Sequence, residues 1–178
     1  MSKILNENHV VLSLQTLSTS PKAGIIQIAA TKFNVKDGIF DNFNVNISPF
    51  DNRKYPDDID ISSSTLKWWT TQPKVLRDAL AANQVTLLTA IKSFNDWFHF
   101  DQSLVWTNGN SFYIPVLNNV YNVLGVKRPF EYYKEMDIRT ISVFCDYPYY
   151  TKNSHNSVLD VENQATHLLK LFKAMSGE

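Results

Sequence analysis

The chain has 178 residues, in which 17 Lys and Arg balance 17 Asp and Glu. Without a basic excess, this composition argues against strong non-specific binding to duplex nucleic acid. The single cysteine, Cys145, excludes an internal disulfide and a cysteine-based zinc site. No apolar run reaches the roughly 20 residues of a membrane-spanning helix, and residues 1–8 lack a signal-peptide core. We therefore expect one soluble, cytoplasmic domain over residues 1–178, with no membrane partner.

The first part of the chain carries strand patterns. Residues 10–15 and 25–33 are rich in apolar and β-branched side chains, and residues 40–47 alternate between polar and apolar. The Lys-Asp-Gly sequence at residues 36–38 is typical of a hairpin turn. These patterns predict a three-stranded antiparallel meander, followed by a polar loop over residues 51–61.

Helical patterns then follow. A serine at position 63 or 64 is suited to cap a helix that contains Trp68 and Trp69, and Pro73 is suited to begin the next. Apolar residues recur at helical spacing in residues 87–98, 116–124 and 158–172, and residues 104–106 predict a short buried strand. This order of strands and helices predicts an α/β fold with helices packed on a sheet.

The first predicted strand carries a polar pair, Ser13 and Gln15, between apolar neighbours. Alternate residues of a strand point to the same side. Two-metal nucleases use this spacing for two carboxylates, because hard oxygen ligands must hold two divalent ions close together. Here both members of the pair are neutral.

Five short strings follow one another between residues 10 and 171. They are Leu14-Gln15-Thr16-Leu17, Trp68-Trp69-x-x-Gln72, Asn108-Gly109-x-x-Phe112-x-x-Pro115, Asp137-x-Arg139-Thr140 and His155-Asn156-Ser157-x-x-Asp160. Together they resemble the DnaQ-like (DEDDh) 3′–5′ exonucleases, in particular the exonuclease VIII-like branch and the phage exonuclease A proteins. The resemblance implies a ribonuclease H-like fold, with a five-stranded mixed sheet flanked by helices.

By the same resemblance, the four metal-binding carboxylates of the family fall on Ser13, Gln15, Tyr113 and Asp160, and its general base falls on His155. Only Asp160 keeps an acidic side chain. The family would use two Mg²⁺ or Mn²⁺ ions, so the resemblance implies that the metal site, and with it every cofactor, is lost. Tyr113 is also larger than the aspartate it replaces, and we expect its ring to fill part of the metal pocket.

Several residues of these strings are candidate contacts for nucleic acid or for a partner: Trp68, Trp69, Asn108, Phe112 and Arg139. For the tryptophan pair, packing in the core competes with binding. For Arg139, a structural ion pair with Asp137 competes with a phosphate contact. His155 and Asp160 are either structural remnants or contacts for a phosphate or a chain terminus. The tyrosine-rich residues 131–133 and 147–150 either pack on the domain, stack on bases or anchor a protein interface.

Three functions remain open. We expect first a catalytically inactive pseudo-exonuclease that binds a protein partner, for example a phage or mobile-element inhibitor or adaptor of a host factor, which would place it in the host cytoplasm. The second is a protein that holds single-stranded DNA or RNA without cutting it. The third is an active 3′–5′ exonuclease with a rebuilt site, for which the spare acids are Asp41, Asp57, Asp58, Asp60 and Glu162. The resemblance also makes a homodimer an expectation.

Overall fold

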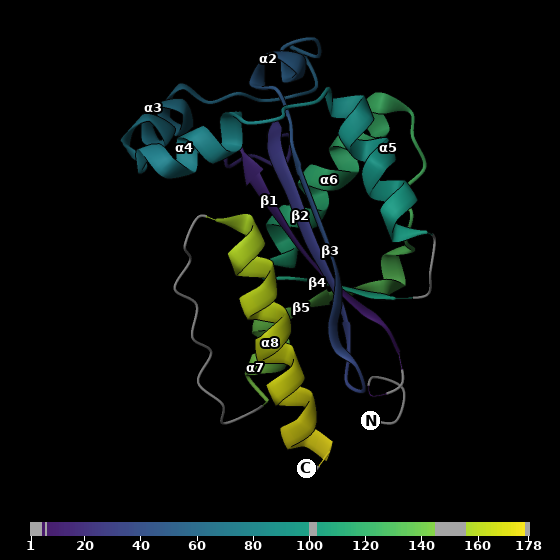
Figure 1. Cartoon of the computed structure of the whole chain (residues 1–178). Helices are drawn as coiled ribbons and strands as arrows, with labels where there is room; N and C mark the ends of the chain where they lie inside the picture. Colours follow the sequence, from purple (N-terminus) through teal and green to yellow (C-terminus); the bar gives the residue numbers. More distant parts are fainter. Residues whose placement is uncertain (1–4, 6, 100–102, 145–155, 177–178) are drawn as a thin grey trace.

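A computed structural model describes residues 5, 7–99, 103–144 and 156–176 of the chain (Figure 1). Its centre is a five-stranded sheet with the strand order β3-β2-β1-β4-β5. The strands are β1 (His9–Thr16), β2 (Ile25–Asn34), β3 (Gly38–Asn46), β4 (Leu104–Thr107) and β5 (Glu135–Asp137). The first three form an antiparallel meander, whereas β4 runs parallel to β1 and β5 runs parallel to β4. The predicted mixed sheet is therefore confirmed.

Helices cover both faces of this sheet (Figure 1). The described helices are α2 (Pro49–Asn52), α3 (Ser63–Thr71), α4 (Lys74–Ala81), α5 (Leu87–Phe98), α6 (Asn110–Leu124), α7 (Ile138–Ser142) and α8 (Ser157–Ser176), with a 3₁₀ turn η1 (Tyr132–Lys134) before β5. Within the described ranges, no helix combines the length and the apolar character that a membrane crossing requires.

The alternation of side chains along β1 divides the core into two layers. Val10 and Leu12 pack on one side of the sheet in a cluster with α5 and α6. Val11 points to the other side, where it joins Leu168 and Phe172 of α8. This follows from the period of two in a strand. Ser13 and Gln15 share the parity of Val11, so β1 directs them toward the side that α8 covers.

The predicted hairpin between β2 and β3 is confirmed. Gly38 ends the turn with a φ of 74°, which favours glycine because other residues meet steric strain there. The side-chain oxygen of Asn34 accepts a hydrogen bond from the backbone N–H of Asp37 at 2.6 Å, which closes the turn. Gly125, which follows the last residue of α6, likewise adopts the left-handed conformation, with a φ of 63°.

The predicted loop over residues 51–61 is wrong at its beginning, where Asp51 and Asn52 belong to α2 and are buried. The Asn52 amide donates to the carbonyl of Ile25 at 3.0 Å and accepts from the N–H of Ile25 at 3.1 Å. The Asp51 carboxylate accepts from the backbone N–H of Leu87 at 2.7 Å. These polar side chains are buried because backbone groups of neighbouring elements satisfy them.

The candidate active-site cleft

Strand β1 and helix α8 bring three of the predicted site residues together. Ser13, near the end of β1, is only 4% exposed. Two residues further, the Gln15 amide donates a hydrogen bond to the hydroxyl of Ser157 at 2.8 Å, across 142 residues of sequence. Asp160 is buried one turn further along α8, and its backbone N–H donates to the carbonyl of Asn156. The first and last motifs of the sequence therefore meet in the fold.

Tyr113 reaches the same place from α6. Its phenol and the Ser13 hydroxyl are hydrogen-bonded to each other. Burial raises the pKa of the Tyr113 phenol above its ordinary value, and the charge of Asp160 raises it further, while the Ser13 hydrogen bond and the charge of Arg139 lower it. The net direction is upward, so the phenol stays protonated and neutral at physiological pH.

These residues do not fit a pair of divalent metal ions. Magnesium and manganese need several oxygen ligands, with carboxylates among them. Of the four corresponding positions, Ser13 and Tyr113 satisfy each other, Gln15 is bonded to Ser157, and Asp160 alone carries a carboxylate. Over the part of the chain that the structure describes, no group of three or more His, Cys, Asp or Glu is arranged to hold a metal ion. The family's predicted base, His155, lies outside the described residues.

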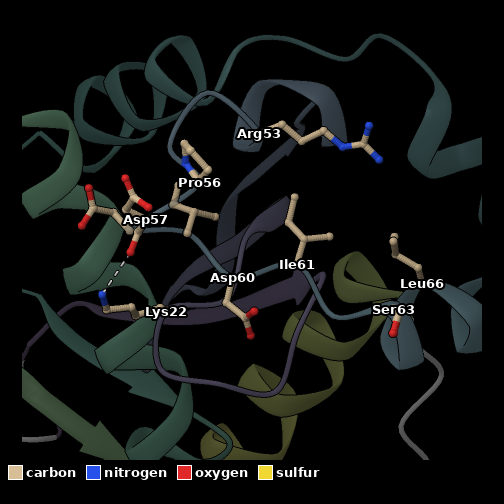
Figure 2. Close-up of a pocket in the computed structure, with 10 residues that line it drawn as sticks. Lys22, Arg53, Pro56, Asp57, Asp60, Ile61, Ser63 and Leu66 are labelled. Atoms are coloured by element: carbon tan, nitrogen blue, oxygen red, sulfur yellow. Dashed lines mark hydrogen bonds between the residues drawn. The ribbon is translucent and has the colours of Figure 1, made fainter.

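The spare acids do not rebuild the site within the described residues. Asp57, Asp58 and Asp60 line a separate hollow of about 550 Å³ together with Lys22 and Arg53 (Figure 2). In this hollow the Lys22 ammonium donates to the backbone carbonyl of Asp57 at 3.4 Å.

The other two spare acids have partners of their own. Asp41 lies 3.8 Å from the ammonium of Lys32, and Glu162 accepts a hydrogen bond from Asn42. None of the five acids is among the residues that line the cavity beside Gln15 and Tyr113.

That cavity, of about 490 Å³, opens between the end of β1, helix α3 and the start of α6. Its lining is aromatic and neutral: Leu14, Gln15, Thr16, Ser18, Thr19, Ser64, Thr65, Trp68, Trp69, Phe112 and Tyr113. We call it the cleft cavity. Among the described residues of this lining none is charged, and they offer a ligand stacking, apolar contact and neutral hydrogen bonds.

The sequence left open whether the tryptophan pair packs in the core or binds a ligand. In the structure the two tryptophans of α3 have different roles. Trp69 is 8% exposed, and its indole N–H donates to the backbone carbonyl of Thr16 at 2.9 Å, so it ties α3 to the end of β1. Trp68 is 39% exposed and packs edge-on against Trp69, with ring centroids 4.8 Å apart. Core packing is therefore the role of Trp69, and Trp68 presents an aromatic surface to the cleft cavity.

Arg139 and Asn108 are brought together at the end of β4 and β5. The ion pair with Asp137, one of the two roles that the sequence left open for Arg139, is not among the ion pairs of the described residues. The Asp137 carboxylate instead accepts from the backbone N–H groups of Arg139, Thr140 and Asn110 at 2.8, 3.1 and 2.7 Å. This occurs because Asp137 caps α7. The Arg139 side chain turns away and donates from Nε to the Asn108 amide oxygen at 3.1 Å.

Sequence reasoning gave no role to Ser157 and Gly109. Ser157 stands inside the last motif, and only its contact with Gln15 reveals its part in the cleft. Gly109 has a φ of 119°, and a Cβ atom there would lie 3.2 Å from Nη2 of Arg139. The Asn-Gly pair was a visible signal for a turn, but not for the close approach of an arginine.

The model of the 3′–5′ exoribonuclease Rv2179c-like domain matches residues 8–172. The chain belongs to this family. A curated relative of this Rv2179c-like chain is an exodeoxyribonuclease of Enterobacteria phage T4, which is 23% identical over 155 residues, covering 73% of this chain and 68% of that protein.

Solved structures with the same fold include the zinc-bound complex of Escherichia coli ExoI with single-stranded DNA. It superposes on the Rv2179c-like chain with a TM-score of 0.69 at 12% identity and covers 97% of it, whereas the chain spans 41% of that protein. The nuclease domain of 3′hExo, a DEDDh family member bound to rAMP, gives a TM-score of 0.60 at 14% identity, with 96% and 93% of the two chains covered. The Rv2179c-like chain is thus a DnaQ-like superfamily member with a ribonuclease H-like fold.

Proposed function

We propose that this chain is a non-cleaving exonuclease-like protein, which holds the end of a single-stranded nucleic acid without hydrolysing it. The observation that carries this proposal is the network in the cleft: Ser13 is bonded to Tyr113 and Gln15 to Ser157 at positions where the family uses metal-binding carboxylates. Hydrolysis by two metal ions needs a water activated at the metals. A site with one carboxylate and a protonated phenol does not hold two metal ions, so it has no such water.

The cleft cavity supports a nucleic-acid ligand. It combines the exposed face of Trp68 with the ring of Phe112 and several hydroxyl and amide groups. Aromatic side chains stack on bases with little dependence on sequence, at about 1–3 kcal/mol per base. The family is described as 3′–5′ exoribonucleases, and solved structures of the same fold contain single-stranded DNA or rAMP. A single-stranded end is therefore the ligand class that we propose for this cleft.

Digestion and binding should be measured on the same oligonucleotides. The full chain is incubated with 3′-labelled single-stranded DNA and RNA in Mg²⁺ or Mn²⁺, and fluorescence anisotropy is recorded in parallel. We expect binding without digestion, unchanged by chelation of metal. Digestion that disappears in an Asp160→Asn variant would instead establish an active enzyme and contradict the proposal.

Restoration of the carboxylates provides the complementary test. We expect the triple variant Ser13→Asp, Gln15→Glu and Tyr113→Asp to gain Mg²⁺-dependent digestion of at least about tenfold over background, because it rebuilds the two-metal ligand set. The matched control adds Asp160→Asn to the triple variant, which should abolish the gain. Digestion by the unmodified chain at the level of the triple variant would argue against lost catalysis.

A protein partner, which the sequence analysis placed first, is favoured by a different feature. Tyr132 and Tyr133 on η1 are 75% and 59% exposed, and their rings contact each other edge-on. Exposed tyrosines are enriched at protein interfaces. If the partner binds there, the double variant Tyr132→Ser and Tyr133→Ser should lose the partner in pull-downs and keep oligonucleotide binding. The homodimer stays a prediction, which light scattering during gel filtration tests.

A further inference from the structure

Arg139 is held in a defined position beside the cleft. Its Nε donates to the Asn108 amide oxygen at 3.1 Å. Its guanidinium lies over Gly109, so closely that a Cβ atom at that residue would be 3.2 Å from Nη2 and 3.3 Å from Cζ. The hydrogen bond to Asn108 and the close approach that glycine permits at position 109 together orient the guanidinium. This leaves the edge formed by Nη1 and Nη2 as its remaining donor pair.

Among the described residues, no acid forms an ion pair with Arg139. The carboxylate nearest in sequence, Asp137, is occupied by three backbone N–H groups. In the described part of the chain, the ion pairs join other residues, and none includes Arg139. Arg139 is exposed to solvent. A fixed, exposed guanidinium with two parallel donors matches the geometry of a phosphate group.

The position of this charge relative to the cleft is also defined. The guanidinium lies over Gly109, whose carbonyl accepts hydrogen bonds from the backbone N–H groups of Phe112 and Tyr113 at 3.0 and 3.2 Å, so Arg139 stands one helical turn from two residues that line the cleft cavity. The lining of the cavity contains no charged side chain within the described ranges of the chain. The cavity therefore suits a base and sugar, and the phosphate that follows them in the chain needs a cation at the rim.

We propose that Arg139, oriented by Asn108 over Gly109, is the phosphate-binding residue of the cleft and contacts the backbone of a single strand whose end lies beside Tyr113. This inference rests on the proposed function, because it assigns the phosphate contact of the same ligand. In the proposed complex, Arg139 supplies the attraction for phosphate that metal ions provide in a two-metal site. Binding is then independent of divalent metal and sensitive to salt.

Salt-dependent binding of one single-stranded oligonucleotide tests this assignment. Each contact between a cation and a phosphate of a single strand contributes about 0.7 to the slope of log affinity against log salt concentration. We expect Arg139→Gln to lower the affinity about tenfold or more and to reduce the slope by about 0.7. Arg139→Lys keeps the charge and should keep the slope with a smaller loss of affinity, because it lacks the two parallel donors.

Two further variants separate the role of Arg139 from general effects. Asn108→Ala releases the guanidinium without changing the charge, so it should weaken binding and leave the slope unchanged. Arg53→Gln is the matched control, since Arg53 is an exposed arginine on the separate hollow (Figure 2), and it should change neither quantity. Circular dichroism melts verify that every variant is folded.

The outcomes distinguish this inference from the proposed function. If the unmodified chain binds the oligonucleotide and Arg139→Gln keeps the same slope and affinity, the phosphate assignment is wrong and the proposed function stands. An equal loss in Arg53→Gln also overturns the assignment, because the effect is then one of net charge. If the unmodified chain binds no single strand at all, the proposed function and this inference fall together.

Discussion

At the scale of single residues, the neutral side chains at the three positions that correspond to carboxylates each have a hydrogen-bond partner. Ser13 pairs with Tyr113, and Gln15 pairs with Ser157. A buried polar group without a partner costs about 1–3 kcal/mol. A network of this kind is therefore stable without metal, whereas a cluster of four carboxylates repels itself unless cations are bound. Under the proposed function, a site of four carboxylates that needs ions corresponds in this chain to a site with one carboxylate, Asp160, that does not.

This difference predicts the effect of one carboxylate returned alone. Ser13→Asp places a second acid in a buried position near Asp160, without the rest of a metal site, and should destabilise the fold by roughly 3 kcal/mol. Ser13→Ala, the control, removes only the hydrogen bond to Tyr113 and should cost about 1 kcal/mol. Urea unfolding in the presence of a chelator measures both. Equal losses would mean that the position already holds a counter-charge or water.

His167 of α8 makes stability depend on acid pH. Burial lowers its pKa below the ordinary value of 6.5, and the charge of Lys170 lowers it further. The unfolded chain therefore binds a proton at a higher pH than the folded one. The contribution of His167 is present above pH 6.5 and is lost as the pH falls through the folded pKa.

Urea unfolding at pH 7.5, 6.5 and 5.5 measures this dependence. The midpoint of the unmodified chain should decrease over this range, and His167→Gln should decrease less, because glutamine does not titrate and still offers Ser142 a hydrogen-bonding group. Parallel pH profiles for the two proteins would show that His167 is not responsible.

At the scale of elements, α3 combines an anchor and a binding face in adjacent residues. Trp69→Phe keeps most of the buried ring but removes the hydrogen bond to Thr16, so it should lower stability by about 1 kcal/mol or more. Trp68→Ala removes an exposed ring and should change stability little, but it should weaken oligonucleotide binding by about 1–3 kcal/mol. Thermal melts and anisotropy on both variants separate the two roles. A binding loss confined to Trp69→Phe would place the stacking surface elsewhere.

The elements also show where sequence reasoning succeeds. The apolar run of β1, the alternation along β3, the turn before Gly38 and the apolar period of α8 are local signals, and each predicted its element. The strand β5 has only three residues, too few for any period to be visible. The polar pair Asp51 and Asn52 gave a loop signal although both are buried, because their partners, Leu87 and Ile25, are distant in sequence.

The candidate site also has a part that the sequence predicted and a part that it did not. The motif order located Ser13, Gln15, Tyr113 and Asp160, because spacing within a strand or helix is local. It did not reveal that Ser13 bonds with Tyr113, since β1 and α6 meet only in the folded chain. It also left open an ion pair between Arg139 and Asp137, because neighbouring opposite charges are a local signal, whereas in the fold the Asp137 carboxylate caps α7.

At the scale of the whole molecule, the core is unequally distributed. The sheet carries a large apolar cluster on each face, one with α5 and α6 and the other with α8. Helices α3 and α4 lie to one side, beyond the end of β1 (Figure 1). They rest on a small separate cluster of Leu17, Ile26, Trp69 and Leu80. Most other side chains of these two helices are exposed.

This distribution predicts that α3 and α4 open before the sheet does. Segments with few buried apolar contacts exchange their amide hydrogens through local openings that cost less than global unfolding. The opening free energy should be lower in α3 and α4 than in β1 and β2 by roughly 2 kcal/mol or more. Trp69→Phe should lower the opening free energy further in these helices and leave that of the sheet unaffected. Native-state hydrogen exchange measures these free energies residue by residue. A bound oligonucleotide should protect α3 first, since Trp68 and Trp69 line the cleft cavity. Uniform protection of α3, α4 and the sheet would show instead that the small cluster is as strongly coupled as the main core.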